Sequence, residues 1–159
     1  MFPIKATIEL ATRADAAEMG ALSKEYVEHG LGWSYTPERL MKLMKNKTKN
    51  VVVARKGNKL AGFGIMTYWE EYANLDLLAV KVQYRRRSIG KQLVGWLIEV
   101  AKTAGMMNVF VQVRKLNYGA IKFYKKLGFH IFDEKPGYYR GEETGVILCL
   151  PIRPFIVGT

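Results

Sequence analysis

The sequence is short of cysteine and of long apolar runs. Cys149 is the single cysteine among 159 residues, so no disulfide can form within the chain, and a reducing compartment such as the cytoplasm is expected. No apolar run approaches the roughly 18 residues that a membrane-spanning helix needs. The opening residues, MFPIKATIEL, hold no basic segment followed by a long apolar one. We therefore expect no signal peptide and no membrane partner.

Acidic side chains are also scarce. The chain has 14 Asp and Glu against 25 Lys and Arg, which gives a formal net charge of +11. Such a charge bears on partners and solubility and leaves the fold open. It is compatible with nucleic acid, an acidic membrane surface or a polyanionic small molecule. His29, His130 and Cys149 are isolated in the sequence, so we expect no metal site.

Repeats, low-complexity tracts and Pro/Ser-rich linkers are absent as well. With 49% hydrophobic residues, the chain can bury a sizeable core, and residues 1–159 are expected to form a single domain. Hydrophobic periodicity predicts helices and strands in alternation. Helices are expected over residues 12–30, 36–46, 90–104 and 117–128. Strands are expected over residues 4–10, 50–70 (a hairpin turning at 56–58), 72–82, 107–114, 129–139 and 144–152. This order predicts a mixed α/β sheet with a parallel crossover through the helix 90–104.

Three consecutive arginines stand where a strand hands over to a helix, in LAVKVQYRRRSIG. The first N–H groups of a helix have no intrahelical partner, and the helix dipole is positive there. Gly90 lets the backbone approach a ligand closely. Four cations surround the same point: Arg85, Arg86, Arg87 and Lys91. The pattern predicts a site for a phosphate or pyrophosphate, and on charge alone single-stranded RNA would also fit.

Two common phosphate motifs do not apply. No GxxxxGK[ST] occurs, so a P-loop is not expected. The Gly-Phe-Gly at 62–64 lies inside a predicted strand and opens no helix, so a dinucleotide-binding fingerprint fails on context.

The stretch LAVKVQYRRRSIGKQLVGWLIEVA resembles the acetyl-coenzyme-A signature of the GNAT superfamily of N-acyltransferases. In that family a strand ending V-x-P-x-[YF]-R leads into [QR]-x-x-G-x-[GA] and a helix. Arg85, Ser88 and Gly90 stand at the three specified loop positions. Val82 replaces the usual proline and Ser88 the usual first glycine. If that position requires a positive φ, Ser88 strains it, although its hydroxyl could donate to a phosphate.

A second stretch, NYGAIKFYKKLGF, resembles the family's N-x-x-A-x-x-[FL]-Y-x-x-x-G-F. Asn117, Ala120, Tyr124, Gly128 and Phe129 match it. Asn117 and Tyr124 are seven residues apart, so they lie on one helix face. The resemblance covers nearly the whole chain and implies a GNAT-like, mixed, mostly antiparallel sheet flanked by about four helices. It is closest to ribosomal-protein and protein N-terminal acetyltransferases.

The resemblance implies acetyl-CoA as cosubstrate and an N-acetyltransferase reaction. Backbone N–H near Val80 would stabilise the oxyanion, and Tyr124 would be the general acid. The implied coenzyme contacts are Leu78, Val80, Arg85, Arg86, Arg87, Ser88, Ile89, Gly90, Lys91, Asn117, Ala120 and Tyr124. In the ribosomal-protein enzymes a glutamate is expected where Gln112 stands, and Gln112 cannot take a proton. Asp76 is the preferred base because it shares a strand face with Leu78 and Val80. Glu70, Glu71 and a water chain are the alternatives.

The acceptor is expected at the turn PGYYRG. Paired tyrosines at this place resemble the peptide-binding hairpin of protein N-terminal acetyltransferases, which assigns Tyr138 and Tyr139 to the acceptor. Trp33, with Tyr35, Tyr68 and Trp69, could add an acceptor wall or form core. The acceptor is a peptide N-terminus or a small-molecule amine, and the positive charge disfavours polyamines.

Two other function classes stay open. A nucleic-acid-binding protein would use residues 42–49 and the arginine run, but no helix-turn-helix or RNA-recognition signature supports it. A catalytically idle acyl-CoA-binding regulator would bind without turnover. A monomer and a homodimer are equally compatible with the sequence.

Overall fold

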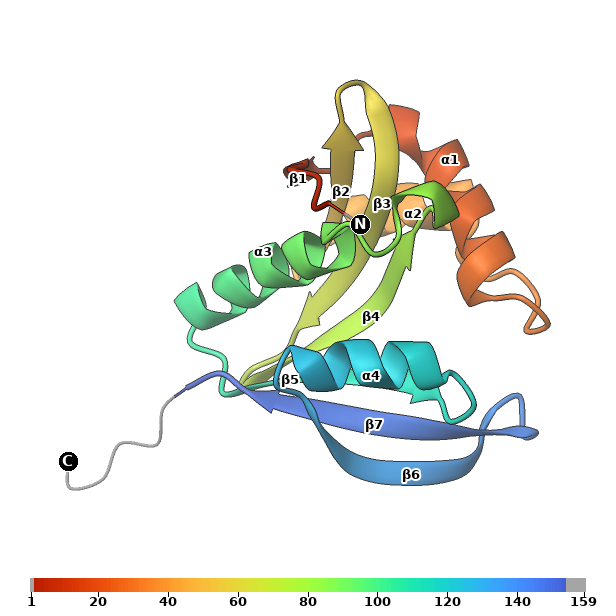
Figure 1. Cartoon of the computed structure of the whole chain (residues 1–159), viewed down its shortest axis with the longest axis vertical. Coiled ribbons are helices and arrows are strands. Elements are labelled where there is room, and N and C mark those ends of the chain that lie inside the picture. Colours follow the sequence, from red (N-terminus) through yellow and green to blue (C-terminus); the bar gives the residue numbers. More distant parts are fainter. Residues whose placement is uncertain (1, 154–159) are drawn as a thin grey trace. The chain divides into compact units, whose positions relative to one another are not determined.

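Seven strands form the sheet of the computed structural model, which describes residues 2–153 (Figure 1). Their order in the sheet is β1-β2-β3-β4-β5-β7-β6. The pairs β1–β2, β2–β3, β5–β7 and β6–β7 are antiparallel, and β4–β5 is parallel. The strands are β1 (Thr7–Leu10), β2 (Lys49–Lys56), β3 (Lys59–Tyr68), β4 (Tyr72–Val80), β5 (Asn108–Arg114), β6 (His130–Tyr139) and β7 (Glu143–Pro151). The expected mixed, mostly antiparallel sheet with a parallel crossover is confirmed.

Four α-helices lie within residues 2–153, as expected: α1 (Ala16–Leu22), α2 (Pro37–Met44), α3 (Ile89–Thr103) and α4 (Tyr118–Lys126). Two of them begin where capping chemistry predicts. Thr36 Oγ1 accepts from Arg39 N at 3.3 Å, and Asn117 Oδ1 accepts from Ala120 N at 3.1 Å. In this part of the chain, no helix is both long enough and apolar enough to cross a membrane.

Residues 12–30 were expected to form one regular α-helix, and this is wrong. Residues 13–27 form a 3₁₀ turn (Arg13–Asp15), then α1, then a π-helix (Ser23–Val27). Glu28 N donates to Ser23 O at 2.7 Å, five residues back, which widens the last turn. The reason is a buried polar contact: Ser23 Oγ donates to the Glu28 carboxylate at 2.9 Å.

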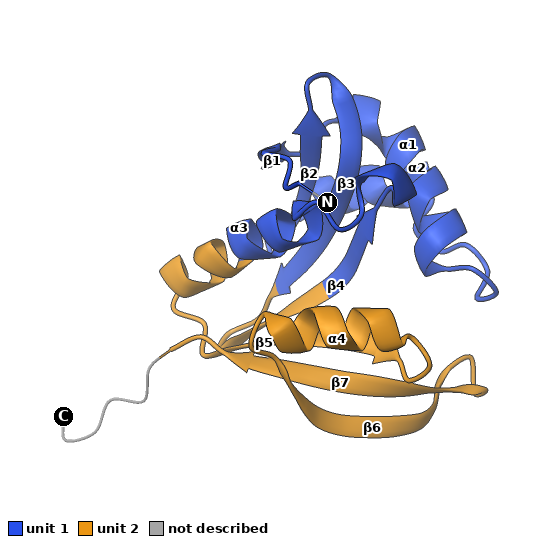
Figure 2. Cartoon of the chain, viewed as in Figure 1, with its two compact units in different colours: residues 1–67, 76–97 blue, residues 68–75, 98–159 orange. Residues whose placement is uncertain are grey.

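The chain divides into two compact units, and the single-domain expectation stays a prediction. Unit 1 comprises residues 1–67 and 76–97 (blue in Figure 2). In it α1 and α2 cover one face of β2 and β3. Gly64 lies on the opposite face of β3, where an added Cβ would be 3.2 Å from Leu97 Cδ1 of α3. The core cluster comprises Met19, Leu22, Leu40, Val51, Val53, Leu60, Phe63, Ile65, Leu77 and Ala79.

Unit 2 comprises residues 68–75 and 98–159 (orange in Figure 2). The start of β4 pairs with β5 from Tyr72↔Asn108 to Leu75↔Val111. Strand β5 then pairs with β7 along its whole length, and β6 forms the outer edge. The buried apolar side chains of unit 2 include Val109, Val111, Val113, Tyr124, Phe129, Val146 and Leu148.

Candidate functional site

The loop between β4 and α3 has an unusual backbone. After a 3₁₀ turn (Val82–Tyr84), Arg86 has φ +58 and Ser88 has φ +65. Left-handed backbone costs a non-glycine residue about 1–2 kcal/mol. The positive φ at residue 88 explains why the resembling family prefers glycine there. Two such residues so close together concentrate strain in this loop, as is common where a ligand is clamped.

The start of α3 presents donors to a ligand. Gln92 N donates to Ser88 O at 3.0 Å, so the N–H groups of Ile89, Gly90 and Lys91 precede the first intrahelical bond. Arg87 Nε is buried and, among the residues that the structure describes, meets no hydrogen-bond acceptor. A buried donor left unpaired costs about 1–3 kcal/mol. A phosphate oxygen is the kind of acceptor that would satisfy it, and the phosphate site expected at this loop stays a prediction.

Arg85 makes contacts that support the loop. Its guanidinium carbon lies 4.9 Å from the centre of the Tyr26 ring, and its Nε donates to Val80 O at 3.2 Å. These contacts join the loop to the π-helix and to the end of β4. The expected role of Arg85 as a phosphate ligand stays a prediction.

The end of β4 offers backbone groups to an extended ligand. Lys81 N donates to Ala61 O of β3 at 2.9 Å. Because successive N–H groups of an antiparallel strand point to alternate sides, those of Leu78 and Val80 point away from β3. The register with β5 runs only to Leu75. The two residues expected to contact the coenzyme therefore carry outward-pointing donors.

Asp76, the expected base, is engaged with two side chains. Thr67 Oγ1 donates to Asp76 Oδ2 in a short hydrogen bond, and Lys49 Nζ lies 3.5 Å from the same oxygen. Lys49 Nζ also donates to Thr67 Oγ1 at 2.5 Å. The carboxylate is held in place by these contacts, and its role as a base stays a prediction.

Tyr124 is buried in unit 2. Its ring packs edge-on against Phe123 and Phe129, with centroids 5.0 and 5.3 Å away. Burial, with the nearby Tyr139 as a second cause, raises the pKa of Tyr124 well above its ordinary value. The phenol is therefore a hydrogen-bond donor at neutral pH that gives up its proton reluctantly. Of its expected partners, Asn117 uses its side-chain oxygen to cap α4, so a ligand contact would come from its NH₂ group.

Gln112 forms a reciprocal amide pair with Asn74. Asn74 Nδ2 donates to Gln112 Oε1 at 3.1 Å, and Gln112 Nε2 donates to Asn74 Oδ1 at 2.7 Å. The pair ties β4 to β5 with two neutral groups. The position where relatives are expected to carry glutamate is thus occupied by an amide that cannot take a proton. Sequence reasoning missed Asn74, although its strand parity with Asp76 was a usable signal.

The tyrosines of the β6–β7 hairpin lie together. The Tyr138 and Tyr139 rings meet edge-on with centroids 4.9 Å apart, and Arg114 lies 5.9 Å from the Tyr139 ring centre. Burial, with Tyr138 as a second cause, raises the pKa of Tyr139 to about 12. An added Cβ at Gly145 would be 2.8 Å from the Tyr138 ring, so only glycine fits beneath it. Tyr138 is exposed and can meet an acceptor.

The remaining expected acceptor residues are aromatic and partly exposed. In unit 1, Trp33 Nε1 donates to Gly20 O at 3.0 Å while the ring is 40% exposed. In unit 2, Trp69 begins a row of rings that sequence reasoning did not foresee. Successive centroids are 6.2, 5.5 and 5.3 Å apart along Trp69, Tyr72, Phe110 and Phe132.

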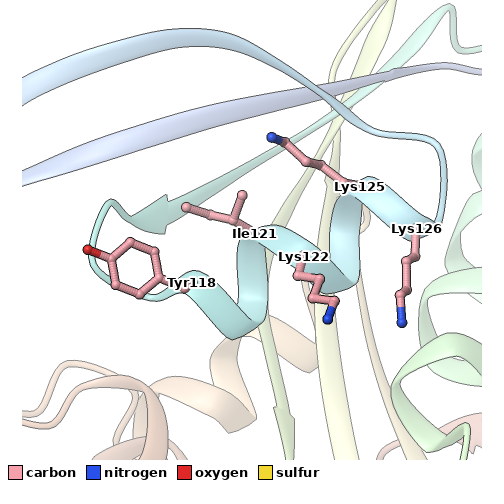
Figure 3. Close-up of a pocket in the computed structure, with 5 residues that line it drawn as sticks. All are labelled: Tyr118, Ile121, Lys122, Lys125 and Lys126. Atoms are coloured by element: carbon pink, nitrogen blue, oxygen red, sulfur yellow. The ribbon is translucent and has the colours of Figure 1, made fainter.

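A pocket lies along α4 (Figure 3). Five residues line it: Tyr118, Ile121, Lys122, Lys125 and Lys126. None of them was expected to bind coenzyme or acceptor. Separately, residues 2–153 contain no group of three or more His, Cys, Asp or Glu side chains that could hold a metal ion.

Comparison with known proteins agrees with the motifs. The family model described as "Acetyltransferase (GNAT) family" matches residues 18–129. The [ribosomal protein bS18]-alanine N-acetyltransferase of Salmonella typhimurium is 33% identical over 98 residues, which are 60% of this chain and 66% of that protein. The matched region thus spans just under two thirds of that relative.

Two solved structures share the fold. The ribosomal-protein-S18-alanine N-acetyltransferase of Escherichia coli superposes with a TM-score of 0.82 at 24% identity, over 98% of this chain and 99% of that one. An aminoglycoside 6'-N-acetyltransferase complexed with coenzyme A gives 0.81 at 20% identity, over 94% and 99%. With its signature loop, its sheet and a family model matching more than half its length, the chain belongs to the GNAT family of acetyltransferases.

Proposed function

We propose that this protein transfers the acetyl group of acetyl-CoA to a primary amine, on a protein N-terminus or a small molecule. The observation that carries the proposal is the loop of residues 85–91. It combines two left-handed residues, a helix start and the buried, unpaired Arg87 Nε within a GNAT-family chain. These features suit a diphosphate. Arg85, Arg86, Arg87, Ser88, Ile89, Gly90 and Lys91 would hold the phosphates, with Asn117 and Ala120 as further coenzyme contacts.

The reaction needs a neutral amine, an oxyanion donor and a partner for the leaving sulfur. The amine nitrogen bonds to the thioester carbon, and the carbon–sulfur bond breaks. The outward-pointing N–H of Val80 would donate to the carbonyl oxygen as negative charge develops there. Tyr124, whose pKa is raised by burial, would donate a hydrogen bond to the leaving thiolate rather than release its proton early.

The proton of the attacking amine goes to Asp76 or to water. Gln112 and Asn74 are neutral amides and serve only as hydrogen-bonding groups. Asp76 is the nearest carboxylate in sequence to the proposed oxyanion donor and lies on the same strand face as Val80. Asp76 is ion-paired with Lys49, so the Lys49 ammonium group would have to move away before Asp76 could accept the proton.

A protein N-terminus is the preferred acceptor. The first relatives are named for the alanine of ribosomal protein bS18, and the paired tyrosines at 138–139 can donate hydrogen bonds to a peptide backbone. Trp33 would contact the acceptor's first side chains. With a substrate of this kind the reaction would take place in the cytoplasm, and either a monomer or a homodimer could carry it out.

The test is release of free thiol from acetyl-CoA against a panel of N-terminal peptides, aminoglycosides, amino acids and polyamines. The proposal predicts fastest release with a peptide that begins with a small residue, and acetylation of its α-amine by mass spectrometry. Coenzyme binding without release from any amine would favour an idle regulator instead. Salt-sensitive RNA binding without coenzyme binding would favour the nucleic-acid function.

A further inference from the structure

We propose that Gln92 and the N-terminal segment of residues 4–6 form a clasp that sets the coenzyme loop in its binding conformation. Gln92 is then a positioning residue for coenzyme binding, although it is not expected to touch the phosphates. The inference rests on the proposed function, because the loop is taken as the diphosphate site. All the residues concerned belong to unit 1.

The side-chain amide of Gln92 makes two hydrogen bonds to the backbone of residues 4–6. Its Oε1 accepts from Ala6 N at 3.0 Å, and its Nε2 donates to Ile4 O at 2.6 Å. The two contacts span 86 and 88 residues of sequence. An amide can serve a backbone in this way because it offers one acceptor and two donors in a plane.

The same amide also reaches the strained residue of the loop. Gln92 Nε2 lies 3.3 Å from Ser88 O and 3.2 Å from Ser88 Oγ, both within donating distance. On the other side of the loop, Ile4 N donates to Arg87 O at 3.0 Å. The clasp therefore binds the carbonyl oxygen of Arg87 and adds a side-chain contact to that of Ser88, which also accepts from Gln92 N at 3.0 Å.

Those two carbonyls decide where the loop's donors point. In a trans peptide unit the C=O of one residue and the N–H of the next point in opposite directions. With Arg87 O bonded to Ile4 N, and Ser88 O bonded to both the backbone N and the side-chain Nε2 of Gln92, the N–H groups of Ser88 and Ile89 face away from the clasp. N–H groups aligned in this way bind anions, whereas a carbonyl turned the same way would repel a phosphate.

The decisive variants are Gln92→Met and Ile4→Pro. Gln92→Met keeps the length of the side chain and removes every hydrogen bond of the clasp that it makes. Ile4→Pro removes the N–H that donates to Arg87 O. Ile4→Ala is the matched control, since it loses the same side chain and keeps the N–H. Calorimetric titration with CoA gives Kd, and steady-state kinetics give kcat and both KM values.

We expect Gln92→Met and Ile4→Pro to raise the Kd for CoA and the KM for acetyl-CoA about tenfold, as the loss of one to two hydrogen bonds allows. The kcat at saturating acetyl-CoA and the KM for the acceptor should stay unchanged, which loss of global stability alone would not produce. Ile4→Ala should bind CoA like the wild type.

Two results would overturn the inference while the proposed function stands: wild-type CoA affinity in Gln92→Met, or equal loss of affinity in Ile4→Pro and Ile4→Ala. A wild-type protein that does not bind CoA would overturn the proposed function, and the clasp with it.

Discussion

Ser88 has a left-handed backbone conformation that glycine adopts with less strain. We predict that Ser88→Gly is more stable than Ser88→Ala by about 1 kcal/mol, because both lose the hydroxyl and only glycine adopts φ +65 without strain. Urea denaturation of the two variants measures the difference. Equal stabilities would show that residue 88 is relaxed in solution.

The phenol of Tyr124 is the group assigned to the leaving sulfur. Tyr124→Phe should lower kcat by about 10²-fold, as loss of one transition-state donor does. The KM for acetyl-CoA should change little, because phenylalanine keeps the packing against Phe123 and Phe129. Steady-state kinetics with a peptide acceptor make the measurement, and an unchanged kcat would remove Tyr124 from the reaction.

Glu28 is a buried carboxylate that organises the segment before α2. It accepts from Ser23 Oγ, from Ser34 N and Oγ, and from Tyr35 N. Burial acts to raise the pKa of Glu28, but these hydrogen bonds outweigh it, so the pKa lies below its ordinary value. A carboxyl group whose pKa is lowered by folding stabilises the fold at neutral pH, and that stability is lost as the pH falls below the ordinary value.

Glu28→Gln should therefore cost about 1–3 kcal/mol of unfolding free energy near pH 7. The gap from the wild type should narrow as the pH falls from the ordinary glutamate pKa towards the lower pKa of folded Glu28, because the unfolded state takes up the proton first and the folded state follows. Urea denaturation of the wild type and of Glu28→Gln, at pH 7 and at a pH below the ordinary glutamate pKa, measures the gap. A gap that is independent of pH would mean that the ionised form makes no special contribution.

At the scale of elements, the loop between β4 and α3 gathers three arginines directly before the start of a helix. The double change Arg86→Ala with Arg87→Ala should raise the Kd for CoA by more than tenfold, because charged hydrogen bonds are worth about 1.5–3 kcal/mol each. The double change Lys59→Ala with Lys102→Ala, at two exposed lysines outside the loop, is the control for the loss of two charges. If both proteins bind CoA equally, net charge and not the loop holds the coenzyme.

The elements with local signals were predictable from the sequence. The helix starts at Thr36 and Asn117 and the turn at Gly57 lie where the sequence pattern predicts them, and Gly128, at the end of the predicted helix 117–128, has a left-handed φ. The signature loop was found the same way, because its spacing is fixed by a tight strand-to-helix turn. Only the residues on either side of each feature decide such local structure.

Other features depend on residues far apart in the chain, and the pattern of neighbouring residues does not specify them. The π-helix depends on Ser23 and Glu28 being buried together. The Asn74–Gln112 pair spans 38 residues, and the clasp of Gln92 spans more than 80. Arg85 was assigned to phosphate by its place in an arginine run, but its contact with Tyr26 comes from tertiary packing.

At the scale of the whole molecule, the net charge of +11 would attract a polyanionic cosubstrate such as acetyl-CoA. CoA carries its negative charges on phosphates, whereas pantetheine carries the same thiol arm without the phosphates and the adenosine. The two compounds therefore separate the contribution of the loop from that of the strand β4 and of α4.

The most direct measurement is calorimetric titration of the protein with CoA and with pantetheine in the same buffer. If residues 85–91 bind the diphosphate, CoA binds at least 100-fold more tightly than pantetheine, about 2.7 kcal/mol, as two charged hydrogen bonds would supply. Equal affinity for the two compounds would contradict this and leave the arginine loop without its ligand.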